Sequence, residues 1–147
     1  MNSSVSSAYE QDFFAWAMTN ARLLREGKLE QIDIENLAEE LEGMGKTQQR
    51  VLISRLTVLL AHLMKWQLQP ELRSRSWKNT IKVQRIDLQE LLEDNPSLRP
   101  QTGEALNRAY RKAKLLAAGD TNMEETSFPE TWPYSFEQAM DEAFWPD

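Results

Sequence analysis

Residues 56–64 read Leu56-Thr-Val-Leu-Leu-Ala-His-Leu-Met64, and this stretch decides the fold. Wound into a helix, it is apolar on most sides, which predicts a buried central helix over residues 47–68. The run is far shorter than the ~20 apolar residues that cross a membrane, and His62 interrupts it. We therefore expect the other segments to pack around this helix, and we expect no membrane contact.

Helices are also expected on both sides of the central segment. Apolar residues recur at spacings of three and four over residues 8–26, 33–42, 74–93, 99–118 and 135–144. Five of the six prolines fall outside these segments, and Pro100 falls in the first turn of one, where proline is tolerated, because proline further inside a helix removes a backbone hydrogen bond. The sequence thus predicts an all-α fold. It would be a single-domain bundle of about five to six helices over residues 1–147, with residues 1–7 disordered and a short last helix.

The ends of these helices carry recognisable signals. Side chains typical of a helix N-cap stand at the expected starts, at Ser7, Asp33, Ser74 or Ser76, and Ser135. Glycines typical of a helix end stand at two of the expected ends, at Gly27 and Gly119. Gly43 and Gly45 each weaken a helix by roughly 1 kcal/mol relative to alanine. They predict a kink or a break before residue 47.

Composition sets further limits. With 147 residues, 41% of them hydrophobic, the chain can bury roughly 70% of its unfolded surface as one domain. The absence of cysteine excludes disulfides, thiolate metal sites and cysteine nucleophiles. Residues 1–7 lack the basic and apolar parts of a signal peptide, so a cytoplasmic protein is expected.

The net charge of −6 is distributed in blocks. Residues 26–42 carry seven acids and one base, whereas residues 46–85 carry nine bases and one acid. Residues 120–147 carry eight acids and no Lys or Arg. Such segregation favours docking between opposite blocks, either within one chain or between two.

Residues 65–78 form a basic and aromatic segment that is a candidate binding surface. Trp66 and Trp77 flank a proline, and three cations lie where the next helix should begin: Arg73, Arg75 and Lys78. A helix N-terminus favours anions, arginine binds phosphate or carboxylate through two hydrogen bonds, and an indole can stack on a base or a guanidinium. Alternatively, Arg73 or Arg75 pairs with the acidic helix of the same chain. A pI near 4.9 disfavours nucleic acid as the ligand.

Few residues are candidates for catalysis. The sequence has no phosphate-binding glycine loop, no Gly-x-Ser-x-Gly elbow and no His-Glu-x-x-His pair. His62 is the only histidine and would act as acid or base, with Asp33 or Glu40 as a further base or as a metal ligand. A lone histidine in a buried helix is more often a packing residue. Glu39 and Glu40 are alternative metal ligands, but bundle di-iron sites need Glu-x-x-His motifs. We expect no cofactor and no metal.

Five stretches of the chain resemble one family. They are Tyr9-Glu-Gln-Asp-Phe-Phe-Ala-Trp16, Asp33-Ile-Glu-Asn-Leu-Ala-Glu-Glu-Leu-Glu42, His62-Leu-Met-Lys-Trp-Gln-Leu-Gln-Pro70, Arg73-Ser-Arg-Ser-Trp77 and Pro129-Glu-Thr-Trp-Pro-Tyr134. In their order and in their residues they resemble the family of domains of unknown function numbered twenty-nine. Its members are small proteins abundant in cyanobacteria and found in other bacteria. The resemblance implies an all-helical fold. It implies no activity and no catalytic residues, because none is established for the family.

Two functions remain open. The first is a non-enzymatic interaction module that binds a protein partner or a second copy, through its segregated charges or through the proline and aromatic strap at residues 128–136. The alternative is an enzyme or nucleic-acid-processing factor with a cleft between residues 33–42 and 65–78. There Arg73 and Arg75 would clamp an anion and His62 would transfer protons.

Overall fold

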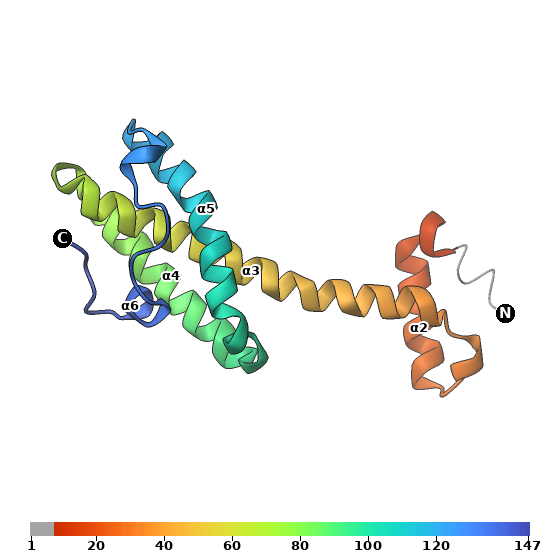
Figure 1. Cartoon of the computed structure of the whole chain (residues 1–147). Helices are drawn as coiled ribbons and strands as arrows, with labels where there is room; N and C mark the ends of the chain where they lie inside the picture. The colour runs from red at the N-terminus through yellow and green to blue at the C-terminus, as the bar shows by residue number, and fades with distance from the viewer. Residues whose placement is uncertain (1–7) are drawn as a thin grey trace. The chain divides into compact units, whose positions relative to one another are not determined.

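The computed structural model describes residues 8–147, and the chain forms two compact units. The N-terminal unit is Met1–Lys46 and the C-terminal unit is Thr47–Asp147. A single domain over residues 1–147 stays a prediction. The expected disorder of residues 1–7 lies outside the described residues. Every regular element within residues 8–147 is a helix, which confirms the all-α bundle (Figure 1).

The N-terminal unit starts differently from the single helix expected over residues 8–26. Residues 8–11 are helical, but Asp12 leaves the helical conformation with φ −149° and ψ 83°. Its carboxylate accepts a hydrogen bond from the Ala15 backbone N–H at 3.0 Å and so begins a new helix, α2 (Phe13–Arg25). Gly27 ends α2 with φ 72°, as predicted. The predicted cap Ser7 lies outside the described residues.

A short 3₁₀ turn, η1 (Leu29–Gln31), leads into α3 (Ile34–Leu68), a continuous helix of 35 residues. Of the two alternatives predicted at Gly43 and Gly45, a kink or a break, the break was therefore wrong. A Cβ added at either glycine would meet nothing within 4 Å, so neither glycine is there to admit a close neighbour. A break would leave several backbone groups at two new helix ends without partners, which costs more than two glycines inside a helix.

The later turns of α3 form the core of the C-terminal unit, as the stretch at residues 56–64 predicts. Leu56, Leu59 and Met64 are fully buried, and α4 (Arg75–Asp94) and α5 (Thr102–Thr121) contribute their apolar faces to the same cluster. Figure 1 shows these two helices beside the later turns of α3. By length and composition alone, α3 is apolar enough to cross a membrane. Half of its most apolar window lies buried inside the protein, as in the core helix of a bundle.

The ends of α4 and α5 settle two sequence predictions. Ser74, not Ser76, caps α4 by accepting a hydrogen bond from the Trp77 backbone N–H at 3.1 Å. A 3₁₀ segment, η3 (Pro96–Gln101), precedes α5, which therefore starts later than residue 99. Gly119 lies inside α5, and its prediction as terminator was wrong. Asn122 ends the helix in the left-handed conformation, which asparagine tolerates better than most residues.

The C-terminal segment packs on this bundle. Phe128 and Trp132 are buried in the core, and the Tyr110 hydroxyl donates a hydrogen bond to the Pro129 carbonyl at 2.6 Å. The predicted capping box of Ser135 and Gln138 is present and starts the short last helix, α6 (Phe136–Met140). That helix ends before residue 144, because the backbone turns extended at residue 141.

Candidate functional site

A groove on the C-terminal unit follows the exposed side of α4. Because Ser74 caps the helix, Arg75 lies in its first turn, and Lys78 and Lys82 follow about one and two turns later on the same side. Two neighbouring cavities, of about 450 and 420 Å³, are both lined by Lys78 and Lys82. They therefore form one surface, which we call the α4 groove.

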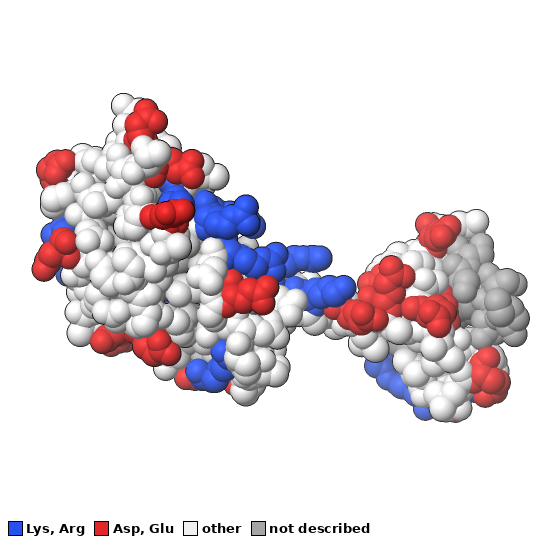
Figure 2. Space-filling model, in the orientation of Figure 1, with Lys and Arg blue, Asp and Glu red and all other residues white. Residues whose placement is uncertain are grey.

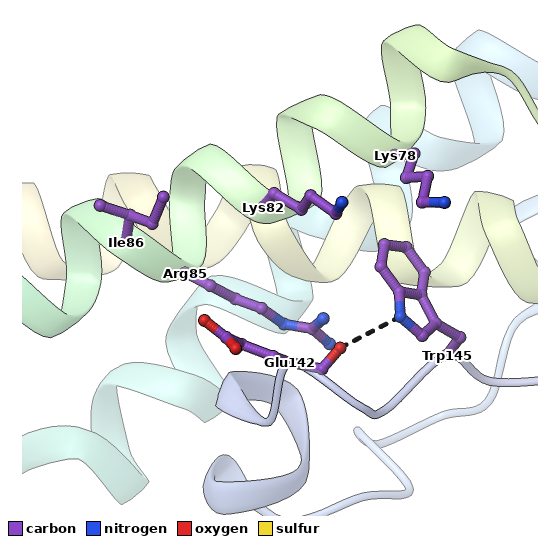
Figure 3. A pocket seen from close by; sticks show the side chains of 6 residues that line it. All are labelled: Lys78, Lys82, Arg85, Ile86, Glu142 and Trp145. Atoms are coloured by element: carbon purple, nitrogen blue, oxygen red, sulfur yellow. Dashed lines mark hydrogen bonds between the residues drawn. The ribbon is translucent and has the colours of Figure 1, made fainter.

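Two tryptophans from distant parts of the chain form the wall of the α4 groove. The ring centroids of Trp66 and Trp145 lie 4.9 Å apart. The Arg73 guanidinium lies 4.8 Å from the Trp66 centroid and donates from Nε to the Trp66 carbonyl at 2.7 Å. Lys78 lies 6.0 Å from the Trp145 centroid, and Figure 3 shows Lys78 and Lys82 both reaching toward that ring. The groove thus combines cations with flat apolar walls.

Arg85 lies at the base of this wall and is almost fully buried, with 3% of its surface exposed. Its Nε and one Nη donate to the carbonyls of Ala139 and Phe144, each at 2.8 Å, and its guanidinium lies 5.3 Å from the Trp145 centroid (Figure 3). The other nitrogen, Nη1, has no hydrogen-bond partner among the described residues. Burial lowers the pKa of Arg85, and the nearby carboxylates of Asp141 and Glu142 partly oppose this shift.

The exposed cations of the α4 groove are not neutralised by ion pairs. Within residues 8–147, Arg75, Lys78 and Lys82 form no salt bridge. Other cations of the same unit do form them, such as Lys65 with Asp120 at 3.0 Å. Glu142 is the one acid that lines the groove. Three cations against one carboxylate leave a net positive surface that attracts anions.

The residues of the basic and aromatic segment have different surroundings. Trp66, Arg73, Arg75 and Lys78 all line the groove. Trp77 lines neither cavity, and its ring instead packs 5.0 Å from the buried ammonium of Lys65. A binding role for these residues stays a prediction, but the first four share one solvent-facing surface.

His62 is held by its own helix. Its Nδ1 lies 2.8 Å from the carbonyl oxygen of Val58, one turn earlier in α3. Desolvation lowers the pKa of His62, and the hydrogen bond to the Val58 carbonyl opposes this shift. The nearby charge of Lys65 lowers the pKa further. This is the arrangement of a half-buried packing histidine whose neutral form is favoured.

The carboxylates considered for catalysis belong to the N-terminal unit and are engaged there. Asp33 accepts hydrogen bonds from Trp16 Nε1 at 2.9 Å and from Asn36 Nδ2 at 2.8 Å. Glu40 accepts a short hydrogen bond from the Tyr9 hydroxyl, and this bond, with desolvation, raises the pKa of Tyr9 to about 12. No group of three or more His, Asp or Glu side chains that could hold a metal, Glu39 and Glu40 included, occurs within residues 8–147.

Among the lining residues that were not predicted as binding residues are Lys82, Arg85 and Trp145. Lys82 could have been found, because it follows Lys78 by four residues on the same helix. Arg85 looks in the sequence like another exposed cation, and its burial depends on carbonyl groups more than fifty positions away. No local pattern places Trp145 beside Trp66.

Comparisons with known proteins give one result. None of the curated proteins and none of the solved structures that were compared matches the chain. The model of the family described as domain of unknown function DUF29 matches residues 8–145, almost the full length of the sequence. The chain therefore belongs to the DUF29 family, as the five quoted stretches predict.

Proposed function

We propose that this protein is a non-enzymatic interaction module, and that the α4 groove binds an acidic, partly apolar segment of a partner protein. The observation that carries the proposal is the row of Arg75, Lys78 and Lys82 beside the paired rings of Trp66 and Trp145. These three cations are exposed and form no salt bridge with any residue from 8 to 147. Lysine and arginine bind carboxylates, while the solvent-facing parts of the two indole rings, which are half-buried, accept apolar side chains beside these cations.

A protein ligand fits this groove better than a nucleic acid does. Glu142 lines one end of the groove and the whole chain carries a net charge of −6. Both oppose any anion, but they oppose a continuous phosphate backbone more than a short acidic segment that also binds through apolar side chains. The Arg73 guanidinium already packs over the Trp66 ring, and the Arg85 guanidinium packs over the Trp145 ring. These contacts compete with the base stacking on which single-strand binders depend.

An enzymatic role has less support. His62, Asp33 and Glu40 each hold a hydrogen bond that serves the local fold. None of them lines the α4 groove. A catalytic acid or base needs to reach a substrate proton, and these side chains present no such arrangement within their own units.

The test is binding of a fluorescently labelled peptide of alternating glutamate and leucine, followed by anisotropy on the full chain. The variant Arg75→Gln/Lys78→Gln/Lys82→Gln should weaken binding at least tenfold. The matched control is Arg108→Gln/Arg111→Gln/Lys112→Gln, which removes three exposed cations from α5, where Figure 2 shows another group of basic side chains. Equal binding by both triple variants would contradict the proposal. Tighter binding of a single-stranded oligonucleotide, lost in the first variant only, would favour the nucleic-acid alternative.

A further inference from the structure

The N-terminal unit has an unusual share of exposed apolar side chains. Eight of the thirteen large hydrophobic residues that are exposed within residues 8–147 belong to it, although it holds less than a third of the chain. They lie on α2, on η1 and on the first turns of α3: Phe13, Phe14, Met18, Leu24, Leu29, Ile34, Leu41 and Met44. Exposed apolar groups that lie together on one helix face mark interaction sites.

Three of them share one face of α3. Ile34, Leu41 and Met44 are separated by seven and three residues and are 63%, 64% and 65% exposed. Helical geometry places them in one stripe, with the half-buried Leu37 between them. Ala38 and Gly45 fall along the edge of this stripe and are also exposed, so a partner helix can approach closely there. We call this surface, Ile34 to Gly45, the α3 face.

The α3 face is bordered by acids. Glu35, Glu39 and Glu42 lie along one side of the stripe and are all exposed. No salt bridge engages them within residues 8–147. Figure 2 shows acidic side chains gathered on the N-terminal unit, whose residues carry nine acids and four bases. The border therefore has a strong negative field and no basic counterpart on this part of α3.

We propose that the α3 face is a second docking surface, and that its ligand is a basic amphipathic helix of a partner protein. The apolar stripe with a methionine at one end accepts the apolar side of such a helix, as grooves of this kind do. The glutamates then pair with lysines or arginines beside that apolar side. A second copy fits less well, because two identical acidic borders would repel each other wherever they meet.

This site is independent of the α4 groove, which takes the opposite charge. The protein would thus recognise two classes of partner, an acidic segment on the C-terminal unit and a basic helix on the N-terminal unit. The segregated charge blocks of the sequence then correspond to two separate binding surfaces.

The probe is a labelled amphipathic peptide of leucine and lysine at helical spacing, titrated into the full chain and followed by anisotropy. We expect binding that weakens at least tenfold in Leu41→Gln/Met44→Gln and also in Glu35→Gln/Glu39→Gln/Glu42→Gln. The matched control is Leu115→Gln/Leu116→Gln, which removes two exposed leucines of α5 and should leave binding within about twofold. Circular dichroism of every variant confirms that the helices are retained.

Three results would overturn the inference. The first is unchanged peptide binding in both variants of the α3 face. The second is equal weakening by the α5 control, which would indicate general adhesion to apolar surface. The third is a combination of two observations: the leucine and lysine peptide fails to bind, and sedimentation shows a concentration-dependent dimer that Leu41→Gln/Met44→Gln abolishes. The occupant of the α3 face would then be a second copy of the chain. Loss of the α4 groove residues should not alter this binding, so the two proposals fail separately.

Discussion

The ammonium of Lys65 lies 3.0 Å from the carboxylate of Asp120 and joins α3 to α5. The two partners differ in environment, since the lysine side chain is 5% exposed and the aspartate side chain 61%. The ring of Trp77 lies 5.0 Å from the same ammonium. The lysine is therefore a buried charge that depends on one carboxylate at the surface and one aromatic face.

Removal of the carboxylate should be costly for this reason. Asp120→Ala should lower the free energy of unfolding in urea by about 1–3 kcal/mol, less than for a fully buried pair because the aspartate is solvated. Lys65→Met removes the buried charge with little change in volume. In that background Asp120→Ala should cost less than about 0.5 kcal/mol. If Asp120→Ala lowered the free energy of unfolding equally in both backgrounds, loss of the ion pair with Lys65 would not be the cause of the destabilisation.

Arg85 should fix the C-terminal segment to α4. Arg85→Met removes two hydrogen bonds from a charged donor, to Ala139 and Phe144, and should destabilise the protein by about 2–4 kcal/mol. The emission of Trp145, isolated by replacing the other tryptophans with phenylalanine, should shift to the red as the ring leaves the surface of α4. Lys82→Met is the matched control on the same helix and should change stability by less than about 0.5 kcal/mol. Similar effects of both substitutions would contradict the assigned role.

Stability should depend on pH through His62. Burial lowers its pKa in the folded protein below the ordinary 6.5, so the unfolded chain binds more protons as the pH falls through that range. The free energy of unfolding should accordingly decrease from about pH 6.5 downward until the folded-state pKa is reached. His62→Gln should remove this part of the pH dependence in urea titrations. An unchanged profile in His62→Gln would show that other groups, such as the carboxylates, account for it.

The sequence predicted the elements whose causes are local. The central helix follows from the apolar run at residues 56–64. The start of α4 was predicted at Ser74 or Ser76, and Ser74 is the N-cap. Asp12 shows the limit of such reasoning. It lies within a periodic apolar pattern, yet its carboxylate competes for the Ala15 N–H and divides the helix.

The candidate site was predictable only in part, because its parts come from different regions of the chain. Lys78 lies about one turn after the start of α4, close to where the sequence places it. The wall opposite is built by Trp145, which reaches Trp66 only after the C-terminal segment has folded over α4. The buried state of Arg85 likewise depends on carbonyl groups of that segment. Such contacts have no periodicity from which they could be inferred.

The two glycines of α3 allow a test of whether the helix is continuous at residues 43–45. Gly43 and Gly45 lie in a continuous helix, and a Cβ at either position meets nothing within 4 Å. Alanine at both positions should therefore raise the free energy of unfolding by about 1–2 kcal/mol in total and increase the helical signal in circular dichroism. Gly27→Ala is the contrasting control, because φ is +72° there and a side chain is strained, so it should destabilise. If Gly43→Ala/Gly45→Ala lowered stability instead, the glycines would be serving as a hinge, and the helix through residues 43–45 would not be the ground state of the chain.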